Sequence, residues 1–188
     1  MSTGTRPTRP DRSLWAVPEV TVAFLSFVLH YVWEFLQVPT YAGMADLNHW
    51  EGIKICTSAT VGDVGFALTA FWITALAARS RHWISGPKRW QLGLFVAVGI
   101  ALTVGFEYYY TEVSLRWTYS DLMPRVPPFG TGLSPLVQWI VVPLLVVSLG
   151  RRVLGPRQSS CRFWIALDRP HRQLSAAARE TSRRDVRL

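Results

Sequence analysis

The chain has 188 residues, of which 49% are hydrophobic and only 17% are charged, and nine are Trp. A chain of this length holds one compact domain, and its composition is that of a membrane protein rather than of a soluble enzyme. The net charge of +8 does not indicate a nucleic-acid partner, because the basic residues gather beside apolar stretches, as membrane insertion requires.

Four apolar segments come close to the roughly 20 residues that a helix needs to cross the hydrocarbon core of a bilayer. They cover residues 20–38, 59–78, 91–110 and 135–149. The first is too long and too polar for a secretory signal, and Pro and Gly residues interrupt the chain between the segments. In lipid there is no water to hydrogen-bond the backbone, so a spanning segment must satisfy its own N–H and C=O groups, as a helix does. We therefore expect an all-α, four-helix membrane bundle flanked by basic tails at 1–19 and 151–188.

The Lys and Arg residues predict the orientation of this bundle. The N-terminal tail, the connection between the second and third spans and the C-terminal tail hold three, four and ten of them. The two remaining connections hold only Lys54, Arg116 and Arg125. The positive-inside rule therefore predicts that both termini are cytoplasmic, in an inner or plasma membrane. The C-terminal tail, with Phe163 and Trp164 near its start, either lies on the inner leaflet or is a loose charged tail.

Polar side chains recur on one face of the first predicted span. His30, Trp33, Glu34 and Gln37 follow the spacing i, i+3, i+4, i+7, which places them together on a helix. An ionisable group costs about 2.5–3.5 kcal/mol at the centre of a membrane helix, so such residues are usually functional. We therefore expect this face to point into the bundle.

The other spans carry Asp63, Glu107 and Gln138, and Tyr110 lies one turn beyond Glu107. In the predicted orientation, all these groups and those of the first span fall in the outer half of the bilayer. The sequence therefore predicts one site built by four helices, with the outer loops as its cap. Arg116 follows Glu107 by nine residues and is the expected counter-ion of a buried carboxylate.

Three chemistries fit these residues, and the sequence leaves them open. His30, Glu34, Asp63 and Glu107 could bind a divalent metal, or could act as acids and bases on a lipid-like or small polar ligand. In an oligomer they could instead relay protons or ions. Trp33, Gln37, Tyr110, Arg116 and Gln138 are the expected supporting ligand contacts. The competing hypothesis is a non-enzymatic scaffold or partner subunit, in which polar groups only hold the helices together.

Two resemblances bear on these hypotheses. The spacing of His30, Glu34 and Glu107 is distantly similar to the sterol isomerase and sigma-2 receptor superfamily. The later Asn and Trp pattern of that superfamily is not matched, and Gln138-Trp139 is the nearest approach to it. That resemblance implies a His and carboxylate cluster around a hydrophobic ligand. The stretches 30–37, 56–63 and 116–139 more closely resemble small, uncharacterised bacterial membrane proteins with four spans. This second resemblance supports the architecture and implies no activity.

Overall fold

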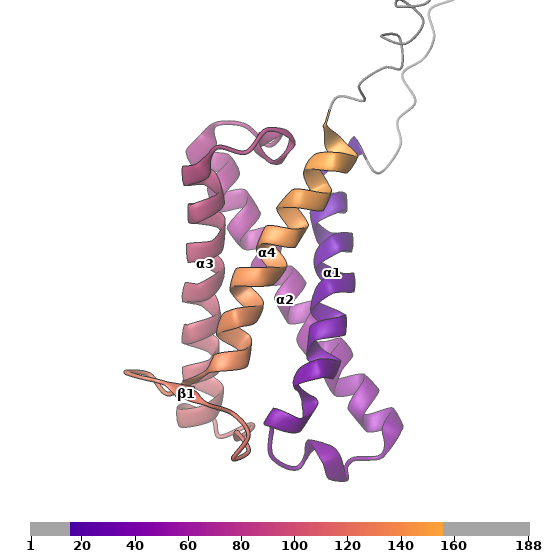
Figure 1. The fold of residues 1–188 in the computed structure, drawn as a ribbon, viewed down its shortest axis with the longest axis vertical. Coiled ribbons are helices and arrows are strands. Elements are labelled where there is room, and N and C mark those ends of the chain that lie inside the picture. The colour runs from indigo at the N-terminus through magenta and orange to yellow at the C-terminus, as the bar shows by residue number, and fades with distance from the viewer. Residues whose placement is uncertain (1–15, 156–188) are drawn as a thin grey trace, which may run out of the picture. The chain divides into compact units, whose positions relative to one another are not determined.

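The computed structural model describes residues 16–155, which form a bundle of helices with a small hairpin at one end (Figure 1). The bundle helices are α1 (Pro18–Gln37), α2 (His49–Ala78), α3 (Arg89–Tyr108) and α4 (Leu133–Leu154). All four are long and apolar enough to cross a membrane, as the sequence predicts. α1 and α3 each pack against both α2 and α4. The predicted all-α class is confirmed, and most of both basic tails lies outside the described residues.

Two ends of the bundle differ in their connections (Figure 1). The hairpin end carries η2 (Val38–Thr40), η3 (Met44–Asp46), the π-helical turn η5 (Tyr109–Val113), β1 (Arg125–Val126) and β2 (Thr131–Gly132). The opposite end carries η4 (Trp83–Ser85), the start of α1 and the end of α4. β1 and β2 are antiparallel, with Arg125 opposite Gly132 and Val126 opposite Thr131. The sequence did not predict this hairpin, because its strands are only two residues long.

Helix α2 is longer than the predicted span, because it begins at His49 and not near Ala59. The Asn48 side chain caps it by accepting a hydrogen bond from the backbone N–H of Glu51 at 3.0 Å. A capped first turn with an acidic residue is a favourable helix start, so the polar stretch before the apolar run is helical and not a loop. The ten residues 49–58, which the sequence predicted to lie before the second span, are therefore the first turns of α2.

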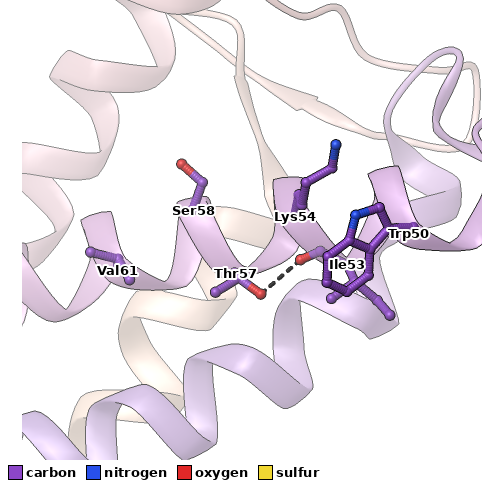
Figure 2. A pocket seen from close by; sticks show the side chains of 6 residues that line it. All are labelled: Trp50, Ile53, Lys54, Thr57, Ser58 and Val61. Carbon is purple, nitrogen blue, oxygen red and sulfur yellow. Dashed lines mark hydrogen bonds between the residues drawn. The ribbon is translucent and has the colours of Figure 1, made fainter.

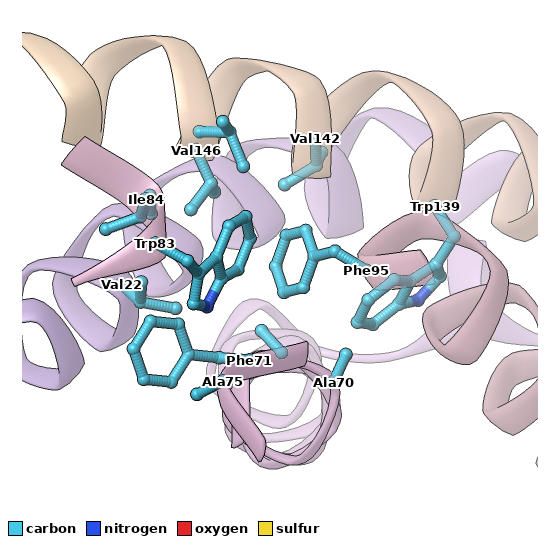
Figure 3. Close-up of a cluster of buried hydrophobic side chains, with 12 residues drawn as sticks. Val22, Ala70, Phe71, Ala75, Trp83, Ile84, Phe95, Trp139, Val142 and Val146 are labelled. Carbon is cyan, nitrogen blue, oxygen red and sulfur yellow. The ribbon is translucent and has the colours of Figure 1, made fainter. Parts of the chain in front are cut away.

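A largely apolar core fills the half of the bundle near η4 (Figure 3). The polar side chains of Thr21 and Thr74 are also buried in this half. Trp83 inserts from η4, with its ring 5.8 Å from the Phe71 ring of α2 and 5.6 Å from the Phe95 ring of α3. Val142 and Val146 of α4 close this core from the remaining side. Its side chains are almost wholly inaccessible, so this half is held by shape complementarity.

The core reaches the middle of the bundle at Trp139, which is 1% exposed. Gly99 of α3 faces this indole so closely that a Cβ atom at Gly99 would overlap the ring. The Trp139 ring also lies 5.0 Å from the imidazole of His30. Trp139 therefore separates the apolar half of the bundle from the polar half.

Candidate polar site

The predicted polar face of α1 points into the bundle. His30 is 1% exposed and Gln37 is 4% exposed, whereas Trp33 and Glu34 are half-buried. Val32 and Leu36, on other faces of the same helix, are exposed. The i, i+3, i+4, i+7 spacing therefore correctly predicts which side of α1 is turned inward.

Gln138 is the centre of the arrangement. Its Nε2 atom lies 2.8 Å from His30 Nδ1, 3.2 Å from Glu34 Oε1 and 3.2 Å from Asp63 Oδ2. His30 and Glu34 belong to α1, Asp63 to α2 and Gln138 to α4. We call these four residues the central cluster. The sequence predicts that they converge, and the structure brings them within hydrogen-bonding distance of one amide.

His30 and Asp63 also form a direct contact, with 3.4 Å between Nδ1 and Oδ2. The two side chains differ in access, since His30 is 1% exposed and Asp63 is 14% exposed. A molecule that reaches the cluster therefore meets the carboxylates before it meets the imidazole. The other side of the imidazole packs against the Trp139 ring.

A chain of hydrogen bonds supports Glu34 from the hairpin end. Gln37 Nε2 donates to Glu34 Oε1 at 2.8 Å, Ser134 Oγ donates to Gln37 Oε1 at 2.9 Å, and Trp33 Nε1 donates to Ser134 Oγ at 3.2 Å. Trp33 and Gln37 thus belong to the hydrogen-bond chain that positions Glu34, and their contact with a ligand stays a prediction. Ser134 was not among the candidate residues, although it precedes Gln138 by one helical turn and shares its face.

Glu107 belongs to a second, adjoining group, which we call the tyrosine cluster. The hydroxyls of Tyr41 and Tyr119 both donate to its carboxylate, the former at 3.3 Å. Tyr119 also accepts a hydrogen bond from the backbone N–H of Gly132 at 3.0 Å. The sequence predicts that Glu107 joins the same site as His30, Glu34 and Asp63. In the described part of the chain it has no hydrogen bond to the central cluster, and the two loops at the hairpin end hold it instead.

The two loops are joined by backbone pairing. Tyr41 and Tyr119 form an antiparallel bridge, with Ala42 N donating to Thr118 O and Ser120 N donating to Thr40 O, both at 2.9 Å. This pairing gives the loops a fixed arrangement above the ends of α1 and α3. The predicted cap at this end of the bundle is thus a pair of hydrogen-bonded loops.

The two phenols of the tyrosine cluster are held in the neutral form. Burial raises the pKa of Tyr41 and of Tyr119, and the nearby Glu107 carboxylate raises both further. The Glu34 carboxylate adds a smaller increase to the pKa of Tyr41. Neutral phenols can donate hydrogen bonds, so Glu107 keeps both donors at any ordinary pH.

The expected role of Arg116 is wrong. Arg116 is exposed, and its guanidinium lies 5.4 Å from the centre of the Tyr110 ring, a cation–π contact. Within residues 16–155, the ion pairs are His30 with Asp63 and Glu19 with Arg81, so no carboxylate pairs with Arg116. Tyr110 contacts Trp117, with 4.5 Å between ring centres, and not the central cluster. Phenol donors replace the expected cation, because the loop path brings Tyr119 to Glu107 and turns Arg116 outward.

The structure also bears on the metal hypothesis. Among the described residues, no three His, Cys, Asp or Glu side chains lie so that they could hold a metal ion. In the central cluster, the amide nitrogen of Gln138 lies among His30, Glu34 and Asp63. An amide N–H group donates hydrogen bonds and repels a cation, so this arrangement suits hydrogen bonding better than metal binding.

No protein family model matches the chain, and neither the curated proteins nor the solved structures compared with it give a match.

Proposed function

We propose that the four helices span a bacterial-type inner or plasma membrane, with both termini cytoplasmic and the hairpin end outside. The exposed large apolar side chains along the helices support insertion, with Leu36, Leu76 and Val61 being 72%, 73% and 58% exposed. Such surface is favourable in lipid and unfavourable in water. The distribution of Lys and Arg supports the orientation, since the connection through η4 is basic and the hairpin end has few cations.

The function that the geometry supports best is an acid–base site, in the outer half of the bilayer, that binds a lipid-like or small polar ligand. One observation carries this proposal: Gln138 Nε2 is surrounded by Glu34 Oε1, Asp63 Oδ2 and His30 Nδ1, and all three accept hydrogen bonds in the His30 tautomer that leaves Nδ1 unprotonated, which we propose here. An amide nitrogen has two hydrogens, so it satisfies two acceptors and leaves the third unsatisfied. The third needs a proton of its own. Glu34 and Asp63 share this proton in our proposal.

A shared proton gives the site its chemistry. A ligand with a polar head would meet Asp63 and Glu34, the more accessible members, and could take up the proton or release one to them. Gln138 fixes the positions of all three groups, and Gln37 and Ser134 fix Glu34.

The scaffold hypothesis is favoured by a different observation. The central cluster links α1, α2 and α4 through side-chain hydrogen bonds, as a device for holding helices together would do. Such bonds contribute on average about 0.6 kcal/mol each in a membrane protein. In that case the carboxylates would be needed for stability and not for a ligand.

Native mass spectrometry of the protein released from mild detergent separates the two proposals. The wild type and a Glu112→Gln control, which changes an exposed carboxylate at the same end, should both retain a discrete ligand mass. Glu34→Gln should lose it while its thermal stability stays equal or rises, because strained sites trade stability for activity. The scaffold hypothesis would be supported by a wild type that carries no ligand. It would also be supported by a Glu34→Gln variant that is less stable than the wild type and retains as much ligand.

A further inference from the structure

A surface hollow on α2 lies outside both polar clusters. It has a volume of about 470 Å³ and is lined by residues from the first three turns of the helix and the start of the fourth (Figure 2). The lining residues are Trp50, Ile53, Lys54, Thr57, Ser58 and Val61. One part of the lining is apolar and another carries an ammonium and hydroxyl groups, so the hollow suits an amphipathic molecule.

The length of α2 places this hollow at the boundary between lipid and water. Its 30 residues, at 1.5 Å each, extend about 45 Å, whereas the hydrocarbon core is about 30 Å thick. If Ala78 lies at the inner boundary, the outer boundary falls about twenty residues earlier, near Ala59. Trp50 and Lys54 then lie at the level of the lipid headgroups, and Val61 lies just inside the hydrocarbon.

Lys54 gives the hollow its charge. It is the one Lys or Arg in the first connection and the first half of α2, and its side chain is exposed. The ion pairs between described residues do not include it, so its ammonium is available to an anion. The Ser58 hydroxyl lies one turn further along, on the same side as the Lys54 ammonium (Figure 2).

The remaining lining residues match the apolar part of a lipid. Trp50 is 66% exposed and Val61 is 58% exposed, and they lie at the two ends of the hollow (Figure 2). The Thr57 hydroxyl is turned to its own helix, where it donates to Ile53 O at 2.7 Å, so it presents its methyl group outward. The polar groups thus lie between an indole at the headgroup level and an aliphatic side chain deeper in the membrane.

We propose that this hollow binds one anionic phospholipid of the outer leaflet. Lys54 and Ser58 contact the phosphate, the Trp50 indole lies beside the glycerol region, and an acyl chain follows Ile53 and Val61 along α2. This inference rests on the proposed membrane insertion but not on the acid–base site. Charge complementarity favours an anionic headgroup, because Lys54 adds about 1 kcal/mol of attraction near the membrane surface.

The test uses the full chain in lipid nanodiscs that contain equal amounts of phosphatidylglycerol and phosphatidylcholine. Native mass spectrometry then gives the ratio of protein with one retained phosphatidylglycerol to lipid-free protein. Lys54→Gln should lower this ratio about five-fold, the factor that corresponds to about 1 kcal/mol. Arg116→Gln removes the same charge at the same end, away from the hollow, and should leave the ratio unchanged.

Three outcomes would overturn the inference: an equal loss in both variants, no change in Lys54→Gln, or retention of phosphatidylcholine as often as phosphatidylglycerol. The first would show a general charge effect. The other two would show that Trp50 and Lys54 are only interfacial anchors. Failure of the wild type to enter nanodiscs would instead contradict the proposed membrane insertion, so the two failures are distinguishable.

Discussion

Near η4, the rings of Phe71, Trp83 and Phe95 pack against one another, whereas near the hairpin His30, Glu34 and Asp63 surround a single amide group. Both regions lie inside the same bundle, on the two sides of Trp139. The first uses mainly apolar contacts, which would be sufficient to hold helices together in the proposed membrane. The second uses ionisable groups, which are costly there and add little that packing could not provide. This difference is the reason to assign stability to one half and chemistry to the other.

The largest predicted effect lies in the apolar half. Phe71 is fully buried, so Phe71→Ala should lower the free energy of unfolding by about 3 kcal/mol. This value is the low end of the usual range, because in the proposed membrane lipid and not water would surround the separated helices. Trp72→Ala, next to it but 45% exposed, is the control and should cost less than about 1 kcal/mol. Unfolding in mixed micelles measures both. Equal costs would show that this half is not the stabilising core.

Helix packing at the boundary between the halves gives the next effect. A Cβ atom at Gly99 would overlap the Trp139 indole, so Gly99→Ala should destabilise the bundle by about 1–3 kcal/mol. Gly62 of α2 has no atom within 4 Å of the corresponding position, so Gly62→Ala should be neutral or stabilising by up to about 1 kcal/mol. Thermal unfolding of the two variants compares them. A stable Gly99→Ala protein would mean that α3 and α4 are not in close contact.

The sequence predicted these helices well and the loops poorly. Hydropathy locates α1, α3 and α4 because lipid requires long apolar helices, and helical spacing identifies the inward face that holds His30 and Glu34. Neither hydropathy nor helical spacing predicts that Tyr119, and not Arg116, contacts Glu107. That contact depends on the path of a loop and on its pairing with Tyr41. The central position of Gln138 could not be predicted either, because it depends on how α1, α2 and α4 pack against one another.

A smaller effect is expected in the tyrosine cluster. Tyr119→Phe removes a donor to Glu107 and the acceptor for Gly132 N, so it should cost about 1 kcal/mol. Tyr108→Phe removes a hydroxyl from a 46% exposed ring and should change stability by less than about 0.5 kcal/mol. Thermal melts of both variants provide the measurement. If Tyr119→Phe has the same melting temperature as the wild type, the hydroxyl does not hold the loops.

Alkaline titration gives the smallest effect. The pKa of Tyr119 is raised in the folded state by burial and by Glu107, so its contribution to stability is complete below about pH 10 and is lost only as the pH rises above that value. The tyrosinate absorbance of the folded wild type should therefore match that of Tyr119→Phe up to about pH 10. A larger signal from the wild type would show that Tyr119 ionises like an exposed phenol.

The shared proton of the central cluster is tested most directly by infrared spectroscopy of the protein in membranes at neutral pH. The wild type should show the C=O band of a protonated carboxyl group, and Glu34→Gln should remove it, because the new amide would supply the missing hydrogen to Asp63. Glu112→Gln should leave the band unchanged. A wild-type spectrum identical to that of Glu34→Gln in this region would contradict the proposed acid–base site.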